Sequence, residues 1–127
     1  MENLNLIVQD PENDRLFQLS DMGVSAYTIT TAEKIWSALI EPGLDSPFGI
    51  AYLDDRVYVA DSRSVKKLSA KDGSKMAEGK LGGFYPRENC AMEIMNGKLI
   101  LLNSYGAIAV YDLVSLEPIK IKPDRFM

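Results

Sequence analysis

The sequence contains no histidine and a single cysteine, Cys90. Without histidine the chain cannot build a Ser-His-Asp triad, a Cys-His dyad, a His-ligated zinc site or a histidine pH switch. With one cysteine it cannot form an intrachain disulfide, which excludes a disulfide-stapled secreted scaffold and suits a reducing compartment. Cys90 lies in an apolar run with no second cysteine nearby, so we expect a buried small hydrophobic residue rather than a reactive thiol.

Long apolar runs and a surplus of positive charge are also lacking. No stretch approaches the ~18 apolar residues that a membrane helix needs, and residues 1–5 lack the basic start and apolar core of a signal peptide. We therefore expect a soluble, intracellular, cytoplasmic protein without a membrane partner. Lys plus Arg number 14 against 18 Asp plus Glu, a net charge of −4. This balance argues against nucleic acid as a partner, because binding phosphates needs positive charge.

Lysines are nevertheless concentrated in the middle of the chain. They are Lys66, Lys67, Lys71, Lys75 and Lys80. Asp72 and Glu78 interrupt the run, so we expect a solvated outer face that discourages edge-to-edge strand pairing.

What the sequence does contain is a repeat. Its 127 residues suit one domain, residues 1–127. A basic residue opens an apolar strand at Arg15, Arg56 and Lys98, spaced 41 and then 42 residues apart. A polar turn precedes each of these strands, and Asn96-Gly97 is a strong hairpin signal because both residues tolerate positive φ.

Each unit contains four short apolar segments separated by turns. The expected strands begin at 4, 15, 25 and 34 in the first unit, at 48, 56, 65 and 75 in the second, and at 90, 98, 107 and 119 in the third. Regularly spaced short strands predict an all-β fold. Four strands in a period of ~40–45 residues are typical of a propeller blade.

Residues 31–40 fit two structures. Ala32, Ile35, Trp36 and Leu39 have the spacing of an amphipathic helix. The repeat instead favours a turn followed by an outer strand over 34–40, in which Ile35 and Trp36 can pack against the neighbouring blade. Strand is the preferred interpretation, and helix stays open.

We therefore predict three four-stranded antiparallel propeller blades, at approximately 3–43, 46–82 and 88–123. Propellers usually have ~4–8 blades, so three blades leave two apolar faces uncovered. We expect two copies to close a six-bladed ring as a homodimer, with the first unit of one copy against the third unit of the other. The alternatives are an open fragment docked on another protein and a flatter, non-propeller sheet.

Residues 46–61, SPFGIAYLDDRVYVAD, resemble an NHL-type repeat. Such repeats read Pro, any residue, Gly-Ile-Ala, a turn, and then an apolar strand that ends Ala-Asp. The first and third units resemble other blades of six-bladed propellers. The resemblance implies a propeller fold along nearly the whole chain, but no single function, because propellers host lyases, lactonases, ligand sensors and scaffolds.

In propellers the loops between the second and third strands and the links between blades commonly form one functional face, here called the loop face. Its candidate binding residues are Asp21, Asp61, Arg63, Tyr85, Arg87, Asn89, Asn103 and Tyr105. The aromatic and arginine side chains of the link 82–89 suit stacking and anion binding. The alternatives are structural: Asp61 accepts backbone N–H bonds of the next turn, and Phe84 and Tyr85 cover a blade edge.

Glu93 lies in an apolar run of an innermost strand, where alternation places it opposite Met92 and Ile94. An inward carboxylate could join Asp61 and Asn103 around calcium, since lactonase-type propellers use a comparable oxygen-rich set. No Asp-x-Asp-x-Asp-Gly loop is present, so a solvated channel Glu93 is the preferred interpretation. We expect no cofactor other than this candidate calcium ion.

Three functions fit these observations. A non-catalytic binding or scaffold protein, with a protein or small ligand on its loop face, is preferred because no nucleophile–base pair can be identified. The second is a carboxylate- or divalent-metal-dependent hydrolase or lyase that acts in the propeller channel. The third is a structural subunit of a virion or another large assembly, which a chain running from Met1 to Met127 without a tag would suit.

Overall fold

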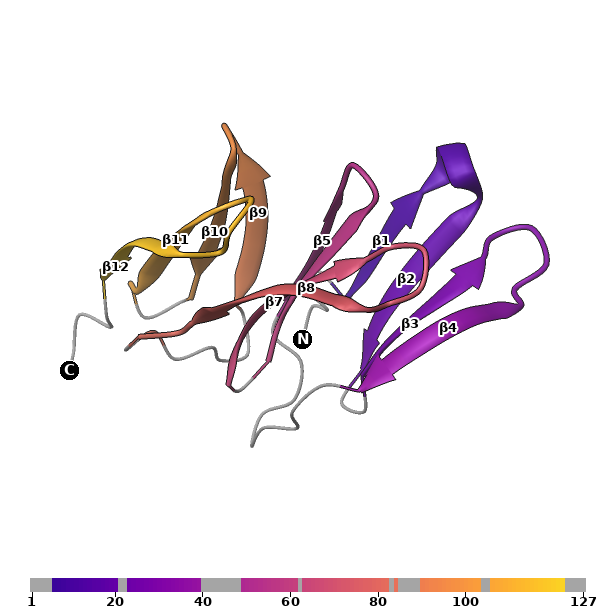
Figure 1. Cartoon of the computed structure of the whole chain (residues 1–127), viewed down its shortest axis with the longest axis horizontal. Coiled ribbons are helices and arrows are strands. Elements are labelled where there is room, and N and C mark those ends of the chain that lie inside the picture. The colour runs from indigo at the N-terminus through magenta and orange to yellow at the C-terminus, as the bar shows by residue number, and fades with distance from the viewer. Residues whose placement is uncertain are drawn as a thin grey trace.

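The computed structural model describes residues 6–20, 23–39, 49–61, 63–82, 84, 90–103 and 106–122. These residues form three four-stranded antiparallel sheets, which lie side by side in Figure 1. Blade 1 comprises β1 (Ile7–Asp10), β2 (Arg15–Ser20), β3 (Gly23–Thr28) and β4 (Lys34–Leu39). Blade 2 comprises β5 (Gly49–Leu53), β6 (Arg56–Ala60), β7 (Ser64–Ser69) and β8 (Lys75–Lys80). Blade 3 comprises β9 (Ala91–Met95), β10 (Lys98–Leu102), β11 (Ile108–Asp112) and β12 (Pro118–Lys122). Each sheet pairs its strands in chain order. The predicted fold class, all-β with three four-stranded blades, is confirmed.

The ambiguous segment at 31–40 forms strand β4 over Lys34–Leu39, not a helix. Contact with blade 2 decides this: the Trp36 indole Nε1 donates to the carbonyl oxygen of Ala70 at 2.9 Å, and its ring packs on the core. In the described residues the helical structure is a single 3-10 turn, η1 (Pro11–Asn13). No described helix has the length and apolar character to cross a membrane.

The same backbone hydrogen bond and positive φ recur in all three blades, in the turn between the third and fourth strands. In blade 1 the N–H of Ala32 donates to the carbonyl oxygen of Thr28 at 2.8 Å. The same bond, again at 2.8 Å, runs from Gly73 to Ser69 in blade 2, and from Leu116 to Asp112 in blade 3. The three donors have φ of 61°, 79° and 61°. A register shift interrupts the third and fourth strands at equivalent places, between Ala26/Tyr27, Lys67/Leu68 and Val110/Tyr111.

Two hydrophobic clusters fill the spaces between the blades. One packs Phe17 of blade 1 with Val57 of blade 2, and the other packs Tyr58 of blade 2 with Leu99 of blade 3. Neighbours along β6 enter different clusters because successive strand residues point to opposite faces. Blade 2 is therefore covered on both faces, whereas the described parts of blades 1 and 3 cover one face of each.

The lysines of blade 2 do not all lie on a solvated face. This expectation was wrong for Lys66, whose side chain is 12% exposed and pairs with Asp61, and for Lys67. Lys67 is buried on the face of β7 that packs on blade 3, where its Nζ donates to the carbonyl oxygen of Val114 at 2.5 Å. Burial, with the nearby charge of Arg56, lowers the pKa of its ammonium group. The alternation of β7 places Lys67 on the same face as Val65, so the ammonium end must find a partner within the junction.

Candidate functional site

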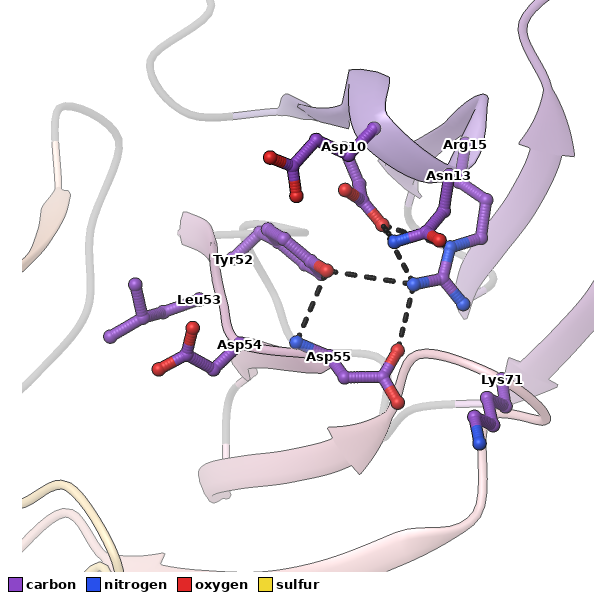
Figure 2. Close-up of a pocket in the computed structure, with 9 residues that line it drawn as sticks. Asp10, Asn13, Arg15, Tyr52, Leu53, Asp54, Asp55 and Lys71 are labelled. Carbon is purple, nitrogen blue, oxygen red and sulfur yellow. Dashed lines mark hydrogen bonds and ion pairs between the residues drawn. The ribbon is translucent and has the colours of Figure 1, made fainter.

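A polar cleft of about 520 Å³ lies where blade 1 meets blade 2 (Figure 2). Arg15 is its central residue: Nη2 donates to Oδ2 of Asp10 and to Oδ1 of Asp55, both at 2.7 Å. The Tyr52 hydroxyl lies 3.5 Å from the same nitrogen. Since Arg15 and Asp10 belong to blade 1 and Asp55 to blade 2, one guanidinium group joins the two blades.

Local sequence explains this placement. Asp54 and Asp55 form the two-residue hairpin turn between β5 and β6, with φ of 49° and 67°. Aspartate tolerates such angles, which match the twist of the flanking strands. The Asp55 N–H donates to the Tyr52 hydroxyl at 3.1 Å, which holds the turn beside Arg15. Arg15 in turn lies over the Phe17 ring, 5.7 Å from its centroid, because both residues face blade 2.

The charges of Arg15, Asp10 and Asp55 partly neutralise one another, while the lining as a whole carries four carboxylates and two cations. Burial opposes ionisation of Asp10, but hydrogen bonds from Arg15 and Asn13 outweigh it and hold the pKa of Asp10 below its ordinary value. Burial likewise opposes the charge of Arg15, and its bonds to Asp55 and Asp10 raise the Arg15 pKa. A cation shared by two carboxylates suits the joining of two blades better than the binding of a further ion.

Asp61 and Arg63, two predicted loop-face residues, lie in the turn after β6. The buried Asp61 Oδ1 accepts the N–H groups of Arg63 and Ser64 at 2.9 and 3.0 Å, and Oδ2 pairs with Lys66 Nζ at 2.7 Å. Burial raises the Asp61 pKa, but these bonds outweigh it and leave the pKa lowered. This is the turn-capping geometry that the sequence suggested for Asp61. The Arg63 side chain is exposed.

The network around Asp61 continues onto β8. The Ser64 hydroxyl donates to Glu78 Oε2 at 2.5 Å, and Lys75 Nζ donates to Glu78 Oε1 at 2.7 Å. The bonds from Lys75 and Ser64 lower the pKa of Glu78 to about 2. Acidic and basic side chains thus pair with one another on this edge of blade 2.

The structure does not bring Glu93 and Asn103 together. Glu93 is exposed and pairs in register with Ile100, whereas Asn103 is buried on the opposite face of the sheet, where its Oδ1 accepts the N–H of Ala107 at 3.1 Å. Asn103 follows Ile100 by three residues, about 10 Å along a strand, beyond the reach of one shared ion. Within the described ranges no three His, Cys, Asp or Glu side chains gather as metal ligands.

The other predicted loop-face residues cannot be placed. Asp21, Tyr85, Arg87, Asn89 and Tyr105 lie outside the described residues. Phe84 is described and has a structural role, but it is buried in the cluster between blades 2 and 3 rather than covering a blade edge.

The Arg15–Asp55 contact was not predicted from the sequence. It lies at the opposite end of β6 from Asp61. Six residues separate Asp55 from Asp61, about 20 Å along an extended strand. A signal was present: Arg15 opens β2 on the same face as Phe17, and a cation on a core-facing position needs an acidic partner.

We predict that the Cys90 thiol resists modification in the folded protein. Cys90 is 1% exposed, and burial raises the pKa of its thiol to about 12. Because the thiolate is the reactive form, a thiol reagent at pH 8 should label the native chain far more slowly than the same chain in denaturant. The unfolded chain is the control, since it exposes the same single thiol. Equal labelling rates would contradict the buried assignment.

Comparison with protein families finds no match, and no curated protein matches the sequence. Three solved structures are similar in fold. The similarity to the Pan2 WD40 domain of Neurospora crassa covers 95% of this chain and 38% of that structure's chain, with a TM-score of 0.73 and 16% identity. BamB of Moraxella catarrhalis matches 94% of this chain and 35% of its own (TM-score 0.71, 19% identity). The computationally designed Ika8 matches 98% and 37% (TM-score 0.71, 10% identity).

These likenesses show that the chain has the β-propeller fold. The chain spans little more than a third of the length of each of these three structures.

Proposed function

We propose that this chain is a non-catalytic β-propeller binding or scaffold module that completes its ring by pairing with a second copy of itself. One observation carries the proposal: the two outer blades each present an uncovered face, and the positions on these faces correspond to positions that pack together inside the chain. The absence of histidine and the buried Cys90 support the non-catalytic part.

The uncovered face of blade 1 is partly apolar. Register places Leu16 beside Tyr27, and Ile7 beside Gln18. Leu39, in register with Gly23, is 84% exposed. Isolated exposed leucines are common, but a set of apolar residues on one sheet face marks an interaction surface.

The uncovered face of blade 3 combines apolar and charged side chains. One row across the sheet places Ile100 and Val110 between Glu93 and Lys120, and the next places Leu102 beside Ile108. Leu102 is 42% exposed. These residues alternate with Leu99 and Leu101, which are buried against blade 2.

The repeat relates the two uncovered faces to each other. Phe17, the third residue of β2, packs with Val57, the second residue of β6. Tyr58, the third residue of β6, lies in one cluster with Leu99, the second residue of β10. At each junction the hydrophobic cluster therefore contains the third residue of one blade's second strand and the second residue of the same strand in the following blade.

Within one chain this pairing of positions ends at blade 3, and a third junction of the same kind needs a second chain. Ile100 is the third residue of β10, and Leu16 is the second residue of β2. Packing Ile100 of one copy on Leu16 of the other reproduces the internal junction, and doing so twice closes a ring of six blades. A two-fold dimer of this kind has no uncovered blade face.

A protein or small ligand would bind on the loop face of this ring, where Arg63 is exposed on blade 2. We retain the NHL-type assignment of the middle blade as part of the proposal. The Asp61 cap after β6 supports it, because the motif ends Ala-Asp at this place.

Native mass spectrometry should detect a dimer of twice 14.1 kDa at micromolar concentration. Leu102→Asp should weaken this dimer about a hundredfold or more, because each of two junctions loses an apolar contact and buries a carboxylate. Met76→Asp is the matched control: Met76 is 46% exposed, on the outer strand of the fully covered blade 2. A monomeric wild type, or equal effects of the two variants, would contradict the proposal.

A further inference from the structure

We infer that each junction between the two copies is fastened by an ion pair between Lys98 of one copy and Asp14 of the other. The inference rests on the proposed six-bladed ring and names a contact by which one copy recognises the other. Its basis is the ion pair between Arg15 and Asp55, which already fastens blade 1 to blade 2 at 2.7 Å.

Lys98 and Arg15 hold the same place in their blades. Each is the first residue of its blade's second strand. Two residues later, Phe17 of blade 1 and Ile100 of blade 3 point toward the side of the following blade. By strand alternation Lys98 therefore lies on the uncovered face of blade 3, as Arg15 lies on the covered face of blade 1.

Asp14 and Asp55 also hold the same place. Each immediately precedes the second strand, with φ of 57° and 67°. The carbonyl oxygens of both accept a backbone N–H at 3.0 Å, from Ile29 in blade 1 and from Ala70 in blade 2. With two such backbone features in common, Asp14 has the place in blade 1 that Asp55 has in blade 2, which is the place that meets a preceding blade.

The junction between blades 2 and 3 shows that this pairing is not a general property of the repeat. Arg56 has the cationic position there, but Gly97 has the position of Asp55 and offers no carboxylate. Only the first junction and the proposed closing junction combine a cation with an acid at these two places.

Both groups are accessible for the contact. Lys98 is exposed; its Nζ lies 3.5 Å from the carbonyl oxygen of Asn96, and its register partners are Met95 and Asp112. Met95 has the place that Asp10 has beside Arg15, so the second carboxylate of the internal cluster is replaced by an apolar residue.

The Asp14 carboxylate is held at the edge of blade 1. Its Oδ1 accepts the N–H and the hydroxyl of Thr30 at 3.1 and 2.9 Å. These two bonds engage one carboxylate oxygen, and a carboxylate has a second oxygen that can accept a bond from Lys98.

A second charged position points to the same partner. Lys120 pairs in register with Val110, as Trp36 pairs with Ala26, so Lys120 has the place of Trp36. Trp36 reaches the turn between the third and fourth strands of the next blade. In the closing junction that turn is 28–33 of the other copy, and it carries the exposed Glu33. Complementary charges on both sides favour a head-to-tail second copy over a nonspecific apolar partner.

Charge reversal in separate chains tests the pair. Lys98→Glu and Asp14→Lys each place like charges at both junctions of a homodimer. We expect each to weaken dimerisation about tenfold. When the two variants are mixed, one junction pairs the two substituted side chains, whose charges are opposite, and the other pairs the native Lys98 with the native Asp14. In an equal mixture, random pairing gives as much heterodimer as the two homodimers together. Native mass spectrometry should therefore find this ratio raised from about one to about ten.

Two controls separate the possible failures. Lys80→Glu reverses an exposed lysine of blade 2 and should leave dimerisation unchanged. Asp14→Asn keeps an oxygen for Thr30 but removes the charge, so a weaker dimer with this variant confirms that charge, not the turn, is responsible. A wild-type dimer with no preference for the heterodimer would overturn the ion pair and leave the ring intact. A monomeric wild type would overturn the ring itself.

Discussion

Replacing Arg15 with alanine is expected to destabilise the folded chain by about 3 kcal/mol, toward the low end for a broken buried ion pair because Asp55 is partly exposed. Arg15 and Asp10 are 9% and 4% exposed, so the substitution leaves the Asp10 carboxylate buried without its main counter-charge. It also removes the link to Asp55 of blade 2. Urea unfolding followed by circular dichroism measures the change.

The matched control is Lys71→Ala, which removes an exposed cation from the same cleft. Its effect should stay within about 0.5 kcal/mol. If Arg15→Ala lost no more stability than Lys71→Ala, the ion pairs of Arg15 with Asp10 and Asp55 would not stabilise the fold.

Acid titration gives a second measurement of the same pair. The folded-state pKa of Asp10 lies below its ordinary 3.8, so Asp10 contributes stability above that value. This stability is lost as the pH falls through the lower folded-state pKa. In Arg15→Ala the pKa is no longer held down by the guanidinium group, so the variant should lose less stability with acid than the wild type. Parallel acid profiles would contradict this account.

Gly73→Ala is expected to destabilise the chain by about 3 kcal/mol, from backbone strain and overpacking together. Gly73 has φ of 79°, and a Cβ built there would lie 2.5 Å from Cε3 of the Trp36 ring. The ring cannot retreat without stretching the bond from its Nε1 to Ala70. The substitution therefore separates the outer edges of blades 1 and 2, and it should lower the thermal midpoint.

Gly97→Ala measures the backbone strain alone, so the difference between the two variants gives the steric part. Gly97 has a similar φ of 74°, but an added Cβ would meet no atom within 4 Å. It should cost only the backbone strain, about 1 kcal/mol. Equal losses for the two glycines would show that contact with Trp36 contributes nothing.

The fold could be predicted because its signals are local. Alternating apolar residues and the turns at Asp54-Asp55 and Asn96-Gly97 place strands within each blade, and the spacing of Arg15, Arg56 and Lys98 counts the blades. Where local signals compete, as at 31–40, the choice depends on the contact of Trp36 with a blade 34 residues further along the chain.

The polar contacts could not be predicted in the same way. Arg15 meets Asp55 across 40 residues of sequence, and only the packing of one blade on the next makes them neighbours. Lys67 was expected in solvent for the same reason: a run of lysines does not reveal which one faces the next blade. Asp61 was easier, because its partners Arg63 and Ser64 are close in the chain.

Main-chain atoms make the bonds that recur in the turn between the third and fourth strands, and alanine, glycine and leucine all stand at its positive φ. Such a turn places little demand on side-chain identity, so substitutions can accumulate there while the geometry persists.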